Sequence, residues 1–274
     1  MLTLITATLN AARFIGQALD SVRMIPPSAI HHIVIDGGSG DETVRICQKF
    51  PAIETVVVPG CSIYEAWNIG LERARGDWIM FLNADDELAE GAAETVAACF
   101  AARPGAGIVA GRALMIERDA PDTRPRLLIA APSGQLDVGQ LALGVPAINA
   151  MAFRRSLFER HGGFDTVYRV AGDRAFLLRL AMRSPPTTLA ITDAVLYRYY
   201  SHSGSLTLQR GLEQRLRIAR DHVSLASRLL AEQPTNQIAK VLRYWRRREA
   251  AVGTFRCAAA GRPLAALQFA GRLF

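Results

Sequence analysis

The sequence predicts an α/β fold, with a mostly parallel sheet flanked by helices and a helical extension at the C-terminus. Short apolar segments alternate with amphipathic ones over residues 1–206, as in chains built from βαβ units. One apolar run, 78–82, stops abruptly at polar residues, which is typical of a strand buried on both faces. Beyond residue 206 the apolar positions recur at helical spacing.

Each expected element follows from these patterns. Strands are predicted at 2–8, 31–35, 55–58, 77–82, 108–116, 149–153 and 194–200, with 127–131 pairing beside 108–116. Helices are predicted at 11–23, 41–50, 62–75, 92–103, 156–161 and 173–183, and the weakly periodic segment 132–146 is expected to form a loop or short helix. In the tail, helices are expected at 212–230 and 236–257, with a break at Pro234 and a last helix starting at Pro263.

Several residues are predicted to begin or end these helices. A Ser three residues before a Glu is the pattern of a capping box, in which each side chain bonds the other's backbone N–H. Gly76 is expected to end the helix at 62–75 as a C-terminal cap, and Gly162-Gly163 to end the helix at 156–161. The three capping boxes expected are Ser39/Glu42, Ser62/Glu65 and Ser156/Glu159.

Length and composition fit one large α/β domain with an appendage. The chain has 274 residues, half of them hydrophobic, so a sizeable core is expected and disorder is not. No basic segment or cleavage pattern follows Met1, and the longest uncharged stretch, 138–153, is too short and polar for a membrane span, so a cytoplasmic protein is expected. The cysteines are scattered, which favours free thiols: Cys47, Cys61, Cys99 and Cys257.

Charge is distributed unevenly along the chain. The net charge is +7, but residues 207–274 hold 13 basic and 4 acidic residues, whereas residues 1–206 hold 19 basic and 21 acidic ones. This asymmetry indicates an anionic surface or partner for the tail. The run Tyr244-Trp-Arg-Arg-Arg248 combines aromatic rings with positive charge, as in segments that lie on anionic membranes. The alternative is a solvated helix face held on the domain by Trp245, and no RNA-binding motif supports a nucleic-acid partner.

The polar residues after the apolar run 78–82 form the strongest candidate site. Asn83, Asp85 and Asp86 follow a strand end, where open α/β sheets have their ligand crevice. Adjacent carboxylates repel unless a cation or donors compensate, and oxygen ligands suit Mg²⁺ or Mn²⁺. A helix N-cap with acids near the helix dipole is the alternative. A dinucleotide site is disfavoured, because the first βα turn, 8–12, has no glycine.

Several motifs, in order and in register, resemble glycosyltransferase family 2, whose members have the GT-A fold. They are Ile5-Thr-Ala-Thr-Leu-Asn10, His32-Ile-Val-Ile-Asp-Gly-Gly-Ser39, Ser62-Ile-Tyr-Glu-Ala-Trp-Asn68 and Phe81-Leu-Asn-Ala-Asp-Asp86. The segments 154–165 and 172–179 extend the resemblance, which covers residues 2–207. It implies a GT-A domain at 1–206, with a nucleotide-binding half at 1–111 and an acceptor half at 112–206, followed by a basic helical extension at 207–274.

The resemblance also implies an activity: inverting transfer of a hexose or N-acetylhexosamine from a nucleotide diphosphate sugar, a UDP-sugar, to an acceptor hydroxyl. The expected setting is surface polysaccharide or glycolipid assembly, with a saccharide or lipid-linked acceptor and peripheral membrane contact through the tail. A divalent Mn²⁺ or Mg²⁺ would stabilise the charge that develops on the leaving diphosphate. The alternatives are a nucleotide-sugar-binding protein that has lost catalysis and a scaffold protein whose basic tail is the functional part.

Roles carried over from the family are assigned residue by residue. Asp85 matches the last acid of the family's DxD motif and is expected to bind the metal, whereas Asn83 replaces the first acid. Asp173 aligns with the general base, although an acid in the first turn of a helix is also common for structural reasons. The expected donor-pocket residues are Thr6, Thr8, Asn10, Asp36 (to the nucleobase), Asn68, Asn83, Asp86 and His202, with Arg198 a similar case to His202.

Some of these residues have ordinary structural alternatives. Thr6 and Thr8 fit plain strand positions, Asn68 fits a solvent-facing helix position, and His202 fits a surface histidine. Two departures from the family pattern, Ile148 and Ala175, affect the expected acceptor geometry more than donor binding.

Overall fold

The computed structural model describes residues 1–120, 122–131, 133–182, 187–202 and 211–272. Contacts within the chain divide it into two compact units. The first comprises residues 1–135, 147–166 and 187–201, and the second comprises 136–146, 167–186 and 202–274. This division groups two internal segments with the tail, so it differs from a boundary at 206/207. The division into a transferase domain and an extension therefore stays a prediction.

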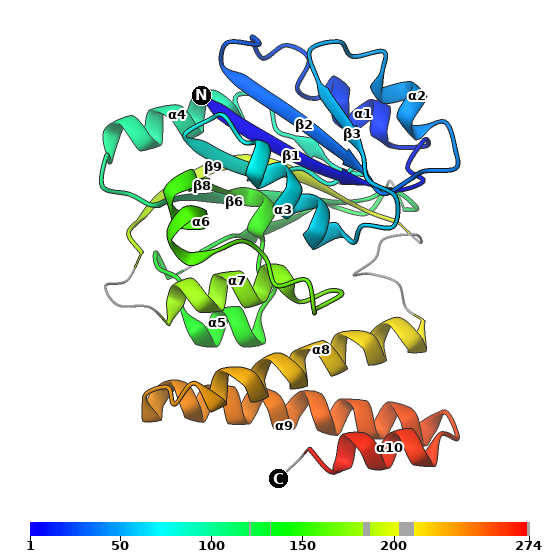
Figure 1. The fold of residues 1–274 in the computed structure, drawn as a ribbon. Helices are drawn as coiled ribbons and strands as arrows, with labels where there is room; N and C mark the ends of the chain where they lie inside the picture. The colour runs from blue at the N-terminus through cyan, green and yellow to red at the C-terminus, as the bar shows by residue number, and fades with distance from the viewer. Residues whose placement is uncertain (121, 132, 183–186, 203–210, 273–274) are drawn as a thin grey trace. The chain divides into compact units, whose positions relative to one another are not determined.

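The first unit is built on one mixed sheet, which in the described residues has nine strands in the order β3-β2-β1-β4-β8-β6-β9-β5, with β7 beside β6 (Figure 1). β1 to β4 are parallel to one another, as are β6 and β9, whereas β8, β5 and β7 run antiparallel to their neighbours. The strands are β1 Leu2–Thr8, β2 Ile30–Asp36, β3 Glu54–Val57, β4 Trp78–Phe81, β5 Glu87–Leu88, β6 Ile108–Glu117, β7 Arg126–Ile129, β8 Met151–Arg154 and β9 Leu189–Ser201. The predicted α/β class is confirmed, and so is the pairing of β7 with β6.

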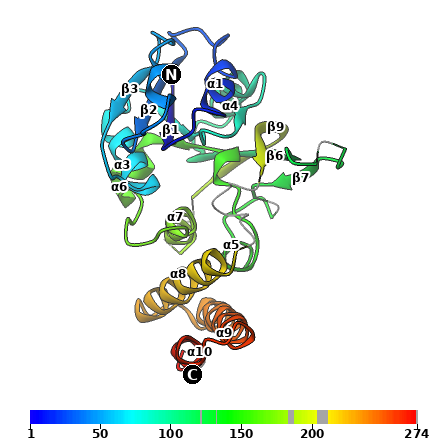
Figure 2. The same ribbon diagram turned by 90° about the vertical axis from the view of Figure 1, so that its right-hand side faces the viewer.

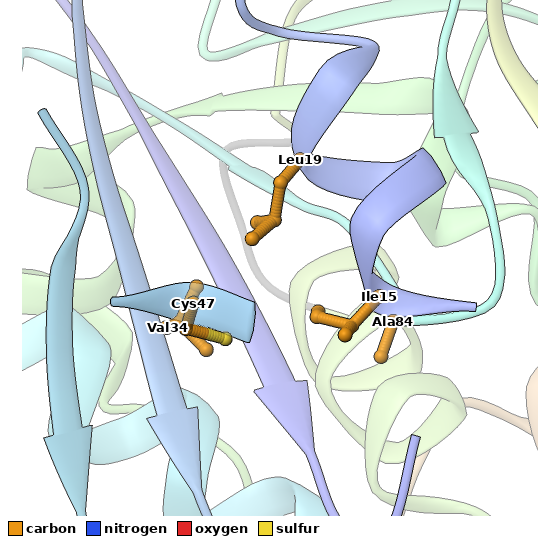
Figure 3. Close-up of a cluster of buried hydrophobic side chains, with 5 residues drawn as sticks. All are labelled: Ile15, Leu19, Val34, Cys47 and Ala84. Atoms are coloured by element: carbon orange, nitrogen blue, oxygen red, sulfur yellow. The ribbon is translucent and has the colours of Figure 1, made fainter. Parts of the chain in front are cut away.

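Helices cover both faces of the parallel part of this sheet. Successive side chains of a strand point to opposite faces, so β2 shows the packing on each side. Val34 packs with Ile15, Leu19 and Cys47 under α1 and α2 (Figure 3). Ile33 and Ile35 pack on the other face, under α3. The helices and the 3₁₀ turn of this unit are α1 Ile15–Asp20, α2 Thr43–Cys47, α3 Ile63–Arg73, α4 Ala92–Ala102, η1 Ile148–Ala150 and α6 Arg155–His161.

Only one of the three predicted capping boxes forms. Ser62 accepts from the Glu65 N–H, and Glu65 accepts from the Ser62 N–H at 2.7 Å, so α3 begins as predicted. The other two predictions are wrong: α2 has Glu42 as its N-cap residue and α6 has Arg154, neither with a side-chain cap. Ser39 instead bonds to a neighbouring loop, as described below.

Gly76 is not a helix cap. α3 ends at Arg73, its C-cap residue Ala74 has an extended backbone, and Gly76 lies in the loop that leads to β4. A Cβ at Gly76 would lie 2.4 Å from the Met1 carbonyl oxygen, and the Gly76 N–H donates to Thr3 Oγ1 at 2.8 Å. A glycine is therefore needed for close approach to β1. Gly162, in contrast, ends α6 with a φ of 76°, as predicted.

The second unit is helical in its described part: α5 Val138–Leu143, α7 Gly172–Ala181, α8 Leu212–Ala231, α9 Asn236–Ala259 and α10 Pro263–Ala270. The three tail helices form a stack (Figure 2). The break at Pro234 and the helix start at Pro263 are confirmed. No helix among the described residues combines the length and apolar character needed to cross a membrane. All four cysteines are unpaired, as expected.

Candidate active site

The predicted site residues of the first unit gather where the parallel strands end. Thr8 and Asp36 are paired in register at the ends of β1 and β2. β4 stops at Phe81, opposite Ile5 on β1, and the Leu82 N–H donates to the Ile5 carbonyl at 3.0 Å. The loops that follow β1, β2 and β4 therefore leave the same edge of the sheet, which is where α/β folds bind ligands.

The loops after β1 and β2 are joined through Asp36 and Asn10. Asp36 is fully buried, and its carboxylate accepts from the N–H groups of Gly38 and Ser39 at 2.9 and 2.7 Å and from the Ser39 hydroxyl at 2.5 Å. Asn10 has a left-handed backbone, with a φ of 50°. Its N–H donates to Ser39 Oγ at 2.8 Å, and its Oδ1 accepts from the Gly40 N–H at 2.9 Å. Both residues thus shape the edge at which they were predicted to bind a nucleotide.

Thr6 and Thr8 differ in their surroundings. Thr6 is fully buried, and its hydroxyl lies 2.9 Å from Nε2 of the buried His32. It offers no exposed surface to a ligand, which matches the strand-residue alternative. Thr8 lies at the strand end and is 6% exposed, and its hydroxyl has no hydrogen-bond partner among the described residues. An unsatisfied buried hydroxyl is unusual, so Thr8 has unused hydrogen-bonding capacity.

The acid loop, residues 83–86, is held by a network around Asp86. The Asp86 carboxylate accepts from the Tyr197 hydroxyl at 2.7 Å, the Tyr200 N–H at 2.7 Å and Asn83 Nδ2 at 3.0 Å. The Tyr197 hydroxyl also accepts from the Asn83 N–H at 3.0 Å. Asp86 is 1% exposed. Its carboxylate therefore fastens the loop to β9 and, in this arrangement, does not face a sugar or a metal.

The two neighbouring acids of the loop have different environments. Burial, and then the negative charge of Asp85, raise the pKa of Asp86 to about 7. The same burial, together with Asp86, raises the pKa of the Tyr197 hydroxyl well above its usual value. Asp85 is only half-buried. Asp85 is therefore the more exposed acid of the pair.

Arg118 braces the backbone at Asp85. It follows β6, and its Nη2 donates to the Asp85 carbonyl at 3.0 Å while its Nη1 donates to Gln17 Oε1 at 2.8 Å. The guanidinium lies 4.0 Å from the Tyr200 ring centre and 5.2 Å from that of Phe14. Such cation–π contacts fix the orientation of the charge. The guanidinium of Arg118 is thus held in a fixed orientation beside the acid loop.

Glu87 and Arg198 form a second link between this loop and β9. The two residues are paired across β5 and β9, with Arg198 Nη1 3.4 Å from Glu87 Oε2. Glu87 is 8% exposed and also accepts from Gln17 Nε2. Arg198, proposed from sequence as a cation for the donor, has this ion pair as its contact in the structure.

Asn68 is engaged with the segment after α6. Its Nδ2 donates to the Phe164 carbonyl at 2.9 Å, and its Oδ1 accepts from the Phe164 N–H at 2.8 Å. A Cβ at Gly163 would lie 2.2 Å from Asn68 Oδ1, so a glycine is needed there. The Asn68 amide therefore clamps the backbone at Phe164. A nucleotide bound by Asn68, as predicted, would have to share the same amide nitrogen and oxygen.

Asp173 and His202 belong to the second unit. Asp173 lies half-buried in the first turn of α7, where its Oδ1 accepts from the Arg174 N–H at 2.7 Å. Arg174 is 9% exposed and donates to the carbonyl groups at the C-terminal end of α5, at 3.0 Å for both Ala142 and Gly144. This capping fixes α7 against α5, and with it the position of Asp173 in this unit. His202 is half-buried at the edge of the described residues.

The departures from the family pattern are apolar packing positions. Ile148 is 1% exposed and Ala175 is 7% exposed. Next to Ile148, Asn149 donates from Nδ2 to the Phe81 carbonyl at 3.1 Å, which secures the end of β4.

A metal would depend on few protein ligands. Among the described residues, no three His, Cys, Asp or Glu side chains are grouped so as to hold an ion. Mg²⁺ and Mn²⁺ sites often use one or two carboxylates and complete the shell with substrate phosphates and water. The half-buried Asp85 fits such a site.

Sequence reasoning missed Tyr197, Arg118, Glu87 and Arg174. Tyr197, Arg118 and Glu87 lie outside the quoted motifs, whereas Arg174 lies within the segment 172–179 next to Asp173. Their partners are brought close by strand pairing or helix packing, and Asn83 and Tyr197, for example, are 114 residues apart in sequence. The one available signal was a polar or charged residue inside an otherwise apolar segment.

Comparisons with known proteins agree with this geometry. A family description, "Glycosyl transferase family 2", matches residues 3–162. A "PGL/p-HBAD biosynthesis glycosyltransferase" of Mycobacterium tuberculosis (strain ATCC 25177 / H37Ra) is 30% identical over 216 residues, which cover 76% of this chain and 79% of that protein. An uncharacterized glycosyltransferase of M. tuberculosis (strain CDC 1551 / Oshkosh) is 31% identical over 196 residues, which cover 68% of this chain and 71% of that protein.

Solved structures share the fold at low identity. S. aureus TarS 1–349 in complex with UDP-GlcNAc has a TM-score of 0.61 at 16% identity, covering 98% of this chain and 90% of that one. Mannosyltransferase PcManGT from Pyrobaculum calidifontis, in complex with GDP-Man and Mn²⁺, has a TM-score of 0.61 at 21% identity, covering 98% and 78%. A longer TarS structure has a TM-score of 0.64 at 14% identity, and this chain spans 43% of its length. These similarities confirm the predicted GT-A class.

Proposed function

Because this chain belongs to glycosyltransferase family 2, we propose that it transfers a hexose or N-acetylhexosamine from a nucleotide diphosphate sugar to an acceptor hydroxyl, with inversion. The observation that carries the proposal is the acid loop, in which Asp86 is buried and tied to β9 while Asp85 is only half-buried. A UDP-sugar is the proposed donor. TarS is described with UDP-GlcNAc and PcManGT with GDP-Man, so both nucleobases belong in the test of the donor.

The donor would bind at the edge formed by β1, β2 and β4. For Asp36 to accept from a nucleobase N–H, its buried carboxylate would have to share or exchange the donors of Gly38 and Ser39. Thr8, paired with Asp36 in register, has an unused hydroxyl. Asn10 supports this edge through its bonds to the loop after β2. A metal-dependent reaction is supported by the half-buried Asp85, which would bind Mn²⁺ or Mg²⁺ together with the diphosphate. Bound there, the cation would supply stabilisation of the charge on the leaving group.

The positive charge of Arg118 lies beside the acid loop. It donates to the Asp85 carbonyl, so it stiffens the backbone that carries the carboxylate. A preorganised carboxylate needs little rearrangement when charge develops, which lowers the barrier in the transition state. Asn83 contributes no charge of its own, and its amide donates to Asp86.

The proposed general base is Asp173, which would take the proton from the acceptor hydroxyl as that oxygen attacks the anomeric carbon. Its place in the first turn of α7 supports the register that the family resemblance implied. We expect Asp173→Asn to keep donor binding and to lose at least about a hundred-fold in transfer, since a positioned base contributes roughly 10²–10⁴. Thermal shift with donor and a transfer assay measure the two properties separately.

A matched control is Glu232→Gln, which changes an exposed acid at the end of α8 and should leave both properties unchanged. Near-normal turnover of Asp173→Asn would exclude the assignment.

The first experiment is a thermal-shift screen of UDP- and GDP-sugars, each with and without Mn²⁺, because a ligand that prefers the folded state raises the Tm. Hydrolysis of the stabilising donor is then measured. Donor binding without any turnover, even to water, would favour the alternative of an inactive nucleotide-sugar-binding protein, which the amide at Asn83 motivates. No Tm response to any donor would contradict the proposed function.

The proposed setting is assembly of a surface polysaccharide or glycolipid on a saccharide or lipid-linked acceptor at the cytoplasmic face of a membrane. The name of the mycobacterial relative, which refers to PGL/p-HBAD biosynthesis, supports such an acceptor class. The basic tail would make a peripheral contact with that membrane. His202, at the start of the segment that leads to the tail, is kept as a proposed contact of the donor.

A further inference from the structure

The tail helices carry a large excess of positive charge. Residues 211–272 contain 12 Arg or Lys and 4 Asp or Glu. Three of the four acids are engaged within the second unit. Asp221 accepts from two backbone N–H groups of the segment before α7, each at 2.8 Å. Glu249 lies 3.3 Å from His222 Nδ1, and Glu213 pairs with Arg262. Because the cations outnumber the acids three to one, the surface of the tail is positively charged.

α9 has one buried side and one outer side. Trp245 is on the buried side: its exposed fraction is 0%, and its ring lies 5.1 Å from that of His222. Trp245 therefore packs against α8 within the second unit and is not part of the surface that α9 exposes. The outer face of α9, defined by exposed residues at spacings of three and four, consists of Lys240, Tyr244, Arg247, Ala251 and Phe255.

This outer face combines large apolar groups with positive charge. Tyr244 is 60% exposed and Phe255 is 74% exposed. The face contains no acid, although α9 does carry Glu249 on its packed side. On α10, Leu264 and Leu267 are 78% and 67% exposed, while the opposite side of that helix packs against α8 and α9 (Figure 2). Exposed rings beside cationic side chains on one helix, with exposed leucines on the next helix, are characteristic of interfacial segments.

We propose that the outer face of α9, with Leu264 and Leu267 of α10, docks the protein on a bilayer that contains anionic phospholipid. This inference names the lipid class and the residues of the peripheral contact proposed above, and it does not depend on sugar transfer. Cationic side chains are attracted to the negative headgroups, while the aromatic and leucine side chains enter the boundary of the acyl chains. None of these helices spans the bilayer, consistent with their composition.

Two other partners fit this surface less well. A second copy of the same face would bring like charges together, which is unfavourable. RNA phosphates would satisfy the cations but would leave Leu264, Leu267 and Phe255 without a role. An anionic bilayer uses both the charge and the apolar groups.

The test is cosedimentation of the full chain with vesicles, without any nucleotide sugar. We expect binding to vesicles that contain phosphatidylglycerol, little binding to phosphatidylcholine alone, and weaker binding at high salt. Lys240→Glu reverses one charge and Phe255→Ser removes one ring, and each should weaken binding by about tenfold or more. Both positions are exposed, so the Tm of each variant should stay near that of the parent.

Matched controls change the same chemistry in the first unit. Arg23→Glu reverses a charge whose side chain is 74% exposed, and Met24→Ser removes an apolar side chain that is 91% exposed. Neither should affect vesicle binding. Absence of binding to phosphatidylglycerol vesicles, equal binding to both vesicle types, or equal loss in the controls would overturn the proposal. Tight binding of homopolymer RNA without vesicle binding would assign the face to RNA instead. Donor hydrolysis in the absence of vesicles should be unchanged in Lys240→Glu, so a failure here is distinct from a failure of the proposed transfer.

Discussion

At the scale of single residues, two adjacent acids have separate roles. Asp86 is buried and accepts three hydrogen bonds, so it organises the acid loop, whereas Asp85 is only half-buried. The sequence assigned both acids to the ligand, because two neighbouring carboxylates look alike in a sequence. The structure distinguishes them through Tyr197 and Tyr200 on β9.

We predict that Asp85→Asn removes the Mn²⁺-dependent part of the donor's thermal shift and lowers kcat/KM by about a hundred-fold or more, because the cation loses its charged protein ligand. The Tm without ligand should change little, since Asp85 is not fully buried. Glu90→Gln is the control, because Glu90 is an exposed acid close to the same loop. A Mn²⁺ response equal to that of the parent would refute the assignment.

Tyr197→Phe is predicted to lower stability by about 1–3 kcal/mol, because it deprives Asp86 of a donor and the Asn83 N–H of an acceptor in a buried place. Urea unfolding measures the change. Tyr244→Phe removes a hydroxyl from a ring that is 60% exposed and should cost almost nothing. Equal effects in the two variants would mean that the network around Asp86 contributes nothing measurable.

At the scale of elements, the pattern of a Ser three residues before a Glu forms a capping box at one of its three predicted positions. Ser62 and Glu65 form the predicted capping box of α3. Ser39 had the same spacing to Glu42, but its hydroxyl donates to Asp36 and accepts from Asn10, so it serves the loops at the site edge. A local pattern predicts a cap only where no stronger tertiary partner is available.

Helix caps therefore give a paired prediction. Ser62→Ala should lower the free energy of unfolding by about 1 kcal/mol, because one N–H in the first turn of α3 loses its acceptor. Ser156→Ala should have an effect within about 0.5 kcal/mol, since Ser156 is exposed and α6 has no side-chain cap. Chemical denaturation of both variants tests the pair, and a larger loss in Ser156→Ala would contradict it.

At the scale of the whole molecule, the buried polar residues of the sheet link stability to pH. Burial, and then the nearby His31, lower the pKa of His32 to about 3. In the unfolded chain this imidazole has its ordinary pKa near 6.5. Between these values the unfolded state binds more protons than the folded state, so the contribution of His32 to stability is complete above about pH 6.5 and is lost as the pH falls.

We predict a difference in pH dependence between the parent and His32→Gln. From pH 6 to pH 4 the parent should lose about 1.4 kcal/mol per pH unit more than the variant, whose side chain does not titrate. The difference between the two proteins removes the contributions of other titrating groups to the pH dependence. One of these is Asp86, whose raised pKa increases stability as the pH falls over the same range. Urea unfolding at each pH gives the measurement, and parallel pH profiles would show that His32 is not kept neutral.

The sequence alone determined the α/β class, the order of the strands along the chain apart from the short β5, the tail helices and the acid loop after β4. These features depend on local periodicity and on motifs a few residues long, which a single sequence displays directly. It also determined the family, through several motifs in register.

Only the tertiary structure decided which polar residues support the fold and which remain available to a ligand. Asn68 clamps Phe164, Thr6 bonds to His32, and Asp86 is buried under Tyr197. The partners lie 96, 26 and 111 positions apart in sequence. No local pattern encodes such pairings, because they arise when strand order and helix packing bring distant segments together and the buried polar groups must find partners.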